Sequence, residues 1–183
     1  NTTYWKRLEI GELTKPQVLT GRFTEFFSKY GLDTSCVTAF NDAYQLALGD
    51  TVLFFPGGLE TVQLLKGKVL QCAVTNGTLI AQQKKLAASG LDKLLDAVFI
   101  SDEIGIEKPN IGFFEAVWDT IGSFAPDEVL IIGDSLTSDI KGGINAGIKT
   151  CWFNPKEAPL PNDLQCDYMI TTLQEVPAIC GIV

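Results

Sequence analysis

Histidine is absent from this chain of 183 residues. Without an imidazole, the chain can form neither a Ser-His-Asp or Cys-His catalytic group nor a zinc site built on histidine ligands. It also lacks the side chain that most often serves as a general base near neutral pH. Any catalysis must therefore use carboxylates, lysine, hydroxyl groups or a bound metal ion.

Several other features are scarce. The five cysteines form no Cys-x-x-Cys pair and no zinc-site spacing. Their odd number, together with the lack of a signal peptide, indicates reduced thiols in a cytoplasmic protein. The longest apolar runs have the length of single strands, so no membrane-spanning helix is predicted. A net charge of −8 argues against a nucleic-acid polymer as partner, although a local phosphate pocket is compatible with it.

The only methionine is Met169, so Asn1 is not an initiator residue, and we expect the chain to be part of a longer protein. Residues 1–49 carry apolar and aromatic side chains at partly helical spacing, with few β-branched runs. They predict two or three amphipathic helices in a small subdomain. The turn residues Pro56-Gly57-Gly58 mark the start of a different pattern, and we assign residues 50–183 to a second unit.

In this second unit, predicted strands and helices alternate, which is typical of an α/β fold with a parallel sheet and right-handed crossovers. The strands are predicted at residues 69–75, 97–101, 128–133, 149–153 and 168–171. The helices are predicted at residues 59–65, 79–88, 111–122, 137–146 and 173–180.

Polar residues follow three successive predicted strands. Thr75-Asn76-Gly77 precedes a helix, where a hydroxyl and free backbone N–H groups can bind an anion. Lys108 precedes the next helix, and Asp134 and Asp139 follow the strand at residues 128–133. Parallel strands bring such groups to one edge of the sheet, and two carboxylates suit Mg²⁺. Two simpler interpretations remain open: the aspartates cap a helix, and Lys108 is a solvated surface lysine.

These segments resemble three motifs of the haloacid dehalogenase (HAD) superfamily of aspartate-nucleophile phosphohydrolases. Val74-Thr75-Asn76-Gly77 is similar to the second motif and Glu107-Lys108-Pro109 to the third. Gly133-Asp134 through Asp139 is similar to the fourth, and residues 140–155 resemble a nucleotidase-like branch. The resemblance implies a Rossmannoid parallel sheet with an α-helical cap, to which residues 1–49 would contribute.

The resemblance also implies roles for the matching residues. Thr75 would hold the phosphoryl oxygens, helped by the Asn76-Gly77 backbone, and Lys108 would offset negative charge on the phosphoryl group. Asp134 would bind Mg²⁺, with Asp139 as a second ligand or as its support. Electrostatic stabilisation of this kind accounts for most of the catalysis in phosphoryl transfer.

The implied activity is a Mg²⁺-dependent phosphatase acting on a small phosphate monoester, with a nucleoside monophosphate as the substrate expected from the branch. A sugar-phosphate or phosphoglycolate phosphatase, or a phosphomutase, is the alternative within the superfamily. An interaction module that binds phosphate without turnover is a second class of function. Substrate specificity is expected in the cap, with Trp5, Arg22 and Tyr44 as candidates. The oligomeric state is left open.

The first motif of the superfamily, an Asp-x-Asp that supplies the nucleophile and the general acid/base, has no counterpart in the chain. In the superfamily it follows the central strand, between the strands predicted here at residues 69–75 and 128–133. Each buried polar group left unpaired at these two edges costs about 1–3 kcal/mol, against a total stability of about 5–15 kcal/mol. We therefore expect this chain alone to be inactive and unstable, with the nucleophile on a segment upstream of it.

Overall fold

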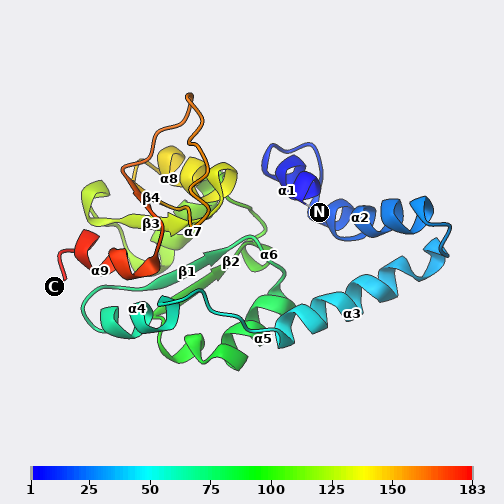
Figure 1. Ribbon diagram of the computed structural model, residues 1–183, viewed down its shortest axis with the longest axis horizontal. Helices are drawn as coiled ribbons and strands as arrows, with labels where there is room; N and C mark the ends of the chain where they lie inside the picture. The colour runs from blue at the N-terminus through cyan, green and yellow to red at the C-terminus, as the bar shows by residue number, and fades with distance from the viewer. Residues whose placement is uncertain (1, 183) are drawn as a thin grey trace.

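The computed structural model describes residues 2–182. Three helices come first, α1 (Thr2–Glu9), α2 (Lys15–Lys29) and α3 (Val37–Asp50), and they form an elongated helical arm beside the rest of the molecule (Figure 1). Helix α2 begins at a capping box, in which Thr14 N donates to the Gln17 side chain at 2.8 Å. Aromatic rings join the helices: the Phe23 and Phe40 centroids lie 5.0 Å apart. The predicted helical character of this region is therefore confirmed.

Strands and helices alternate in the remainder, as predicted. The strands are β1 (Cys72–Thr75), β2 (Ala97–Ile100), β3 (Leu130–Gly133), β4 (Lys149–Phe153) and β5 (Tyr168–Ile170). The helices are α4 (Gly58–Leu65), α5 (Leu79–Ser89), α6 (Ser101–Ile104), α7 (Ile111–Ile121), α8 (Lys141–Ala146) and α9 (Val176–Ile179).

Several predicted boundaries are wrong. Strand β1 begins at Cys72 rather than at residue 69, because a turn follows α4, with Lys68 N donating to Leu65 O at 2.9 Å. The helix predicted at residues 137–146 is divided into a π-helical turn, Leu136–Ile140, and α8. Similarly, a 3₁₀ turn precedes α9 in the last predicted helix, and the short helix α6 was not predicted.

All strand pairs within residues 2–182 are parallel, but they form two sheets rather than one. Strand β1 pairs with β2, and β3 pairs with β4, which pairs with β5. Strands β1 and β3 do not pair with each other in this part of the chain. A cavity of about 730 Å³ lies between them, lined mostly by apolar side chains of both strands and of α4, α7 and α9. Each sheet therefore has one parallel edge that faces this cavity.

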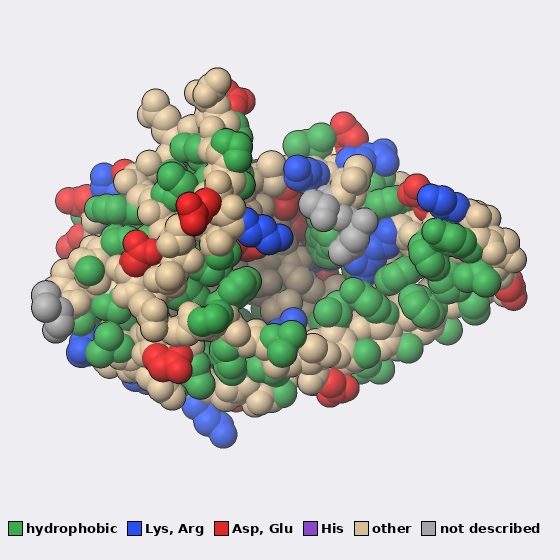
Figure 2. All heavy atoms as spheres, in the orientation of Figure 1, with side chains coloured by type: hydrophobic (Ala, Val, Ile, Leu, Met, Phe, Trp, Pro, Cys, Tyr) green, Lys and Arg blue, Asp and Glu red, His purple; other side chains and the backbone are tan. Residues whose placement is uncertain are grey.

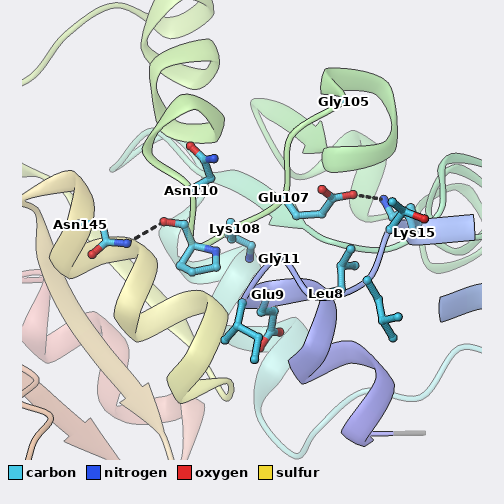
Figure 3. A pocket seen from close by; sticks show the side chains of 13 residues that line it. Leu8, Glu9, Gly11, Lys15, Gly105, Glu107, Lys108, Asn110 and Asn145 are labelled. Carbon is cyan, nitrogen blue, oxygen red and sulfur yellow. Dashed lines mark hydrogen bonds and ion pairs between the residues drawn. The ribbon is translucent and has the colours of Figure 1, made fainter. Parts of the chain in front are cut away.

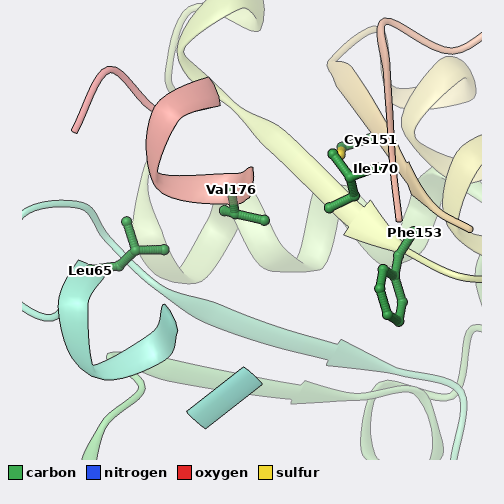
Figure 4. Close-up of a cluster of buried hydrophobic side chains, with 5 residues drawn as sticks. All are labelled: Leu65, Cys151, Phe153, Ile170 and Val176. Atoms are coloured by element: carbon green, nitrogen blue, oxygen red, sulfur yellow. The ribbon is translucent and has the colours of Figure 1, made fainter. Parts of the chain in front are cut away.

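Two hydrophobic clusters hold the helices on the strands. In the first, Phe113, Phe114 and Val117 of α7 pack on Phe99 of β2 and Ile131 of β3. The second joins β4 and β5 to α4 and α9, and Figure 4 shows its five buried members, Leu65, Cys151, Phe153, Ile170 and Val176. The carboxyl ends of the two sheets lie at a common edge, because the Lys108 side chain contacts both Val74 O of β1 and the carboxylate of Asp139 after β3. No helix within residues 2–182 has the length and apolarity needed to cross a membrane.

Candidate active site

The centre of the candidate site is an ion pair between Lys108 and Asp139. Lys108 Nζ lies 2.6 Å from Asp139 Oδ1 and also donates to Val74 O at 2.8 Å. The two residues are only 4% and 9% exposed. The sequence left open that Lys108 is a solvated surface lysine, and its burial excludes this. A buried ammonium of this kind requires a charged partner, which Asp139 provides.

Asp139 is held by the turn that follows β3. Its second carboxylate oxygen accepts a hydrogen bond from Ser135 N at 3.1 Å. Gly133, the last residue of β3, makes this approach possible, because a Cβ atom there would collide with the Asp139 carboxylate. Both carboxylate oxygens of Asp139 thus accept a contact from the protein, which fixes the side chain beside Lys108.

Asn76 clamps the backbone of Lys108. Its side-chain oxygen accepts from Lys108 N at 2.9 Å, and its side-chain nitrogen donates to Lys108 O at 2.8 Å. This double hydrogen bond ties the loop after β1 to the loop before α7. The sequence predicted a role for the backbone of Asn76 but did not reveal this function of its side chain.

Thr75 and Gly77 form a tight turn at the start of α5. The Thr75 hydroxyl accepts a hydrogen bond from Gly77 N at 3.1 Å. Thr78, the N-cap residue of α5, donates its hydroxyl to Gln45 of α3 at 2.9 Å, so the turn is also tied to the helical arm. The hydroxyl of Thr75 and the amino end of α5 therefore lie together, as an anion site requires.

Asp134 is an exposed carboxylate directly after β3. Its backbone oxygen accepts from Trp152 Nε1 at 3.2 Å, which fixes the backbone at this point. No cluster of three or more acidic, cysteine or histidine side chains suited to a metal occurs in the described residues. Mg²⁺ is commonly held by only one or two carboxylates and keeps several waters. The exposed Asp134 fits such an ion, which would need further oxygen ligands.

Two residues of the helical arm reach the site, and sequence reasoning missed both. Glu9, at the end of α1, lies against the turn after β3. Burial raises the pKa of its carboxyl, and hydrogen bonds with the hydroxyls of Thr137 and Ser138 partly offset this rise. Lys15, at the start of α2, contacts Glu107 (Figure 3). Neither residue belongs to a local motif, so only their contacts across the fold could identify them.

A cavity of about 670 Å³ lies between the helical arm and the core, and both Glu9 and Lys15 line it. It is lined by the segment from Leu8 to Lys15 and by core residues that include Lys108, Asn110 and Asn145 (Figure 3). Figure 2 shows that the surface is hollowed between the helical arm and the core. The cavity therefore extends from the surface to the loop that carries Lys108.

The proposed specificity residues come together in the helical arm. The Arg22 guanidinium carbon lies 5.1 Å from the centre of the Tyr44 ring and 6.0 Å from that of Trp5. It also lies 4.6 Å from the ring of Phe23, a contact that the sequence did not suggest. Burial lowers the pKa of Arg22 from its ordinary value.

Comparisons with known proteins are consistent with this geometry. A family model described as haloacid dehalogenase-like hydrolase matches residues 3–147. The chain is 33% identical over 182 residues to the HAD-hydrolase YfnB of Bacillus subtilis, covering 100% of this chain and 77% of YfnB. It is also 33% identical over 177 residues to the pyrimidine 5'-nucleotidase PynA of Streptococcus pneumoniae, covering 96% of this chain and 74% of PynA.

A crystal structure of YfnB bound to magnesium superposes with a TM-score of 0.90, covering 99% of this chain and 79% of that one at 33% identity. The backbone fold of this chain is thus shared with a protein of known structure over nearly its whole length.

Proposed function

Because this chain belongs to the haloacid dehalogenase-like hydrolases, we propose that it forms the larger part of a Mg²⁺-dependent phosphatase that hydrolyses a nucleoside monophosphate. The observation that carries the proposal is the buried Lys108–Asp139 pair beside the Thr75 turn, at the carboxyl edge of the strands. The 33% identity to the nucleotidase PynA over nearly the whole chain supports the substrate class.

Each residue of the site has a role in this proposal. The Thr75 hydroxyl and the backbone N–H groups at the start of α5 bind the phosphoryl oxygens. The Lys108 ammonium lies in a buried environment, where its attraction to the phosphoryl charge is stronger than in water. Asp139 and Asn76 fix Lys108, and the exposed carboxylate of Asp134 holds Mg²⁺. The ion would neutralise charge on the phosphoryl oxygens.

The proposal also assigns a role to each part of the chain and to the cavity between β1 and β3. Residues 1–49 act as part of a cap over the site, and residues 50–183 form a core that lacks its central strand. The cavity between β1 and β3 accommodates an extended apolar segment, which can pair with both parallel edges. A carboxylate at the end of that segment attacks the phosphorus, the bond from phosphorus to the ester oxygen breaks, and the second aspartate of the segment, in its protonated form, gives its proton to the departing alcohol and later accepts one from the attacking water. Water then attacks the resulting aspartyl phosphate and releases orthophosphate.

The first test is the mass of the protein purified from its natural source. A mass above the 19.9 kDa of this chain, together with hydrolysis of nucleoside monophosphates that EDTA abolishes, is the expected result. Sugar phosphates should be tested in parallel, since a higher kcat/KM for them would replace the nucleotide assignment. A mass of 19.9 kDa without turnover would contradict catalysis, and saturable phosphate binding in that case would indicate an interaction module.

A pair of lysine variants tests the site itself. Lys108→Met should lower kcat by about 100-fold or more, the order expected when one stabilising group of a transition state is removed. Lys141→Met is the matched control, because Lys141 is an exposed lysine near the same edge of the core. Equal activity of the two variants would exclude Lys108 from the reaction.

A further inference from the structure

Lys15 is a buried lysine at the amino end of a helix, a position that does not favour a positive charge. It is the first residue of α2, where the helix dipole disfavours a positive charge, and it is only 9% exposed. Burial of an ammonium is also unfavourable unless other groups compensate for the lost water. Neither the helix nor the hydrophobic effect accounts for a lysine here, so its reason must lie in what it contacts.

The Lys15 ammonium contacts the ends of two strands and the loop before α7. It donates to the hydroxyl of Ser101, a fully buried residue, at 2.9 Å. It lies 3.3 Å from Asp102 Oδ1 and 3.4 Å from Glu107 Oε1, the latter contact shown in Figure 3. It is also 3.5 Å from Gly77 O, in the turn after β1. One side chain of the helical arm therefore joins three segments of the core.

These segments carry the groups proposed to bind phosphate. Gly77 donates its N–H to the Thr75 hydroxyl, and Glu107 directly precedes Lys108. Asp102 accepts a hydrogen bond from Leu79 N, at the start of α5. Any displacement of Lys15 thus acts on the Thr75 turn and on the Lys108 loop together.

The charges around Lys15 argue against direct binding of the substrate phosphate. One ammonium faces two carboxylates, those of Asp102 and Glu107, so the cluster carries an excess of negative charge. The excess negative charge repels a phosphate, whereas the two carboxylates attract the Lys15 ammonium of the helical arm. The ammonium is thus fully used by the protein.

We propose that Lys15 is a positioning residue, which links docking of the helical arm to the order of the Thr75 turn and the Lys108 loop. The proposal rests on the phosphatase function proposed above. With Lys15 in place, the two loops are held in the geometry that binds phosphate. Without it, the arm loses an anchor and both loops become more mobile.

The test is hydrogen–deuterium exchange, combined with calorimetric binding of orthophosphate, in the intact protein. Lys15→Met should raise amide exchange at residues 76–79 and 105–108 and weaken phosphate binding by about tenfold, the order expected when a charge-assisted contact is lost. Lys15→Arg should restore both, because a guanidinium can bind the same carboxylates. Lys29→Met, an exposed lysine of the same helix, should match the wild type.

Unchanged exchange at both loops in Lys15→Met would overturn the proposal, and weaker phosphate binding in that case would instead mean direct contact with the ligand. If Lys15→Met loses protection from amide exchange throughout the chain, Glu107→Gln is measured instead. This variant removes one of the two carboxylates that contact Lys15, so it should raise exchange in the same two loops. A wild type that binds no phosphate would refute the proposed function, whereas the exchange comparison would still test Lys15.

Discussion

The Lys108–Asp139 pair allows a quantitative test of how burial controls the strength of an ion pair. Lys108→Met removes the ammonium and leaves a carboxylate that is 9% exposed, with Ser135 N as the donor to its second oxygen. Asp139→Asn leaves the ammonium buried without a countercharge. Each substitution keeps nearly the same volume, so the main change is in charge.

Removing one partner of a buried pair costs about 3–5 kcal/mol, whereas replacing both partners by neutral groups is often close to neutral. We therefore expect each single variant to lose about 3–5 kcal/mol of unfolding free energy, and the double variant to lie within about 1.5 kcal/mol of the wild type. For a protein of this size, the single variants should melt about 6–20 °C lower.

Urea unfolding, followed by the fluorescence of the three tryptophans, measures these free energies. EDTA should be present so that metal binding does not contribute. The matched control is the Lys84–Asp50 pair, whose atoms lie 2.7 Å apart but whose side chains are 40% and 64% exposed. Its coupling energy should be only about 0.2–1 kcal/mol. Additive losses at Lys108 and Asp139, or equal coupling in both pairs, would refute the reasoning.

Three further predictions concern single positions. Gly133→Ala should destabilise the protein and abolish turnover, since its Cβ would collide with the Asp139 carboxylate; wild-type melting would contradict this. Backbone hydrogen bonding from β4 holds the pKa of Asp167 below its ordinary value. Its contribution to stability should therefore be complete above about pH 5 and disappear as the pH falls through the folded pKa, so unfolding curves of wild type and Asp167→Asn should converge in acid. Burial raises the pKa of Cys151 to about 12, so iodoacetamide should label the exposed Cys36 long before Cys151 in the folded protein, as peptide mass spectrometry can show.

The sequence alone determined those features that depend on neighbouring residues. Alternation of apolar strands and amphipathic helices predicted a parallel α/β fold, which the structure confirms. The helix predicted at residues 79–88 is observed as Leu79–Ser89, and Gly90 ends it with φ at 73°. The order of Thr75, Lys108, Asp134 and the strands before them also required only local patterns, because parallel strands bring their carboxyl ends to one edge.

Only the tertiary structure decided how those groups are used. Lys15 reaches Ser101, 86 residues away along the chain, and Asn76 clamps Lys108, 32 residues away. Whether Lys108 is solvated or buried depends on the groups that β1, the loop after it and the turn after β3 place around it. Helix and strand propensities act over a few residues, whereas burial and ion pairing depend on how distant segments close on one another. For this reason, the chemical groups could be predicted from spacing, but their partners and their electrostatic environment could not.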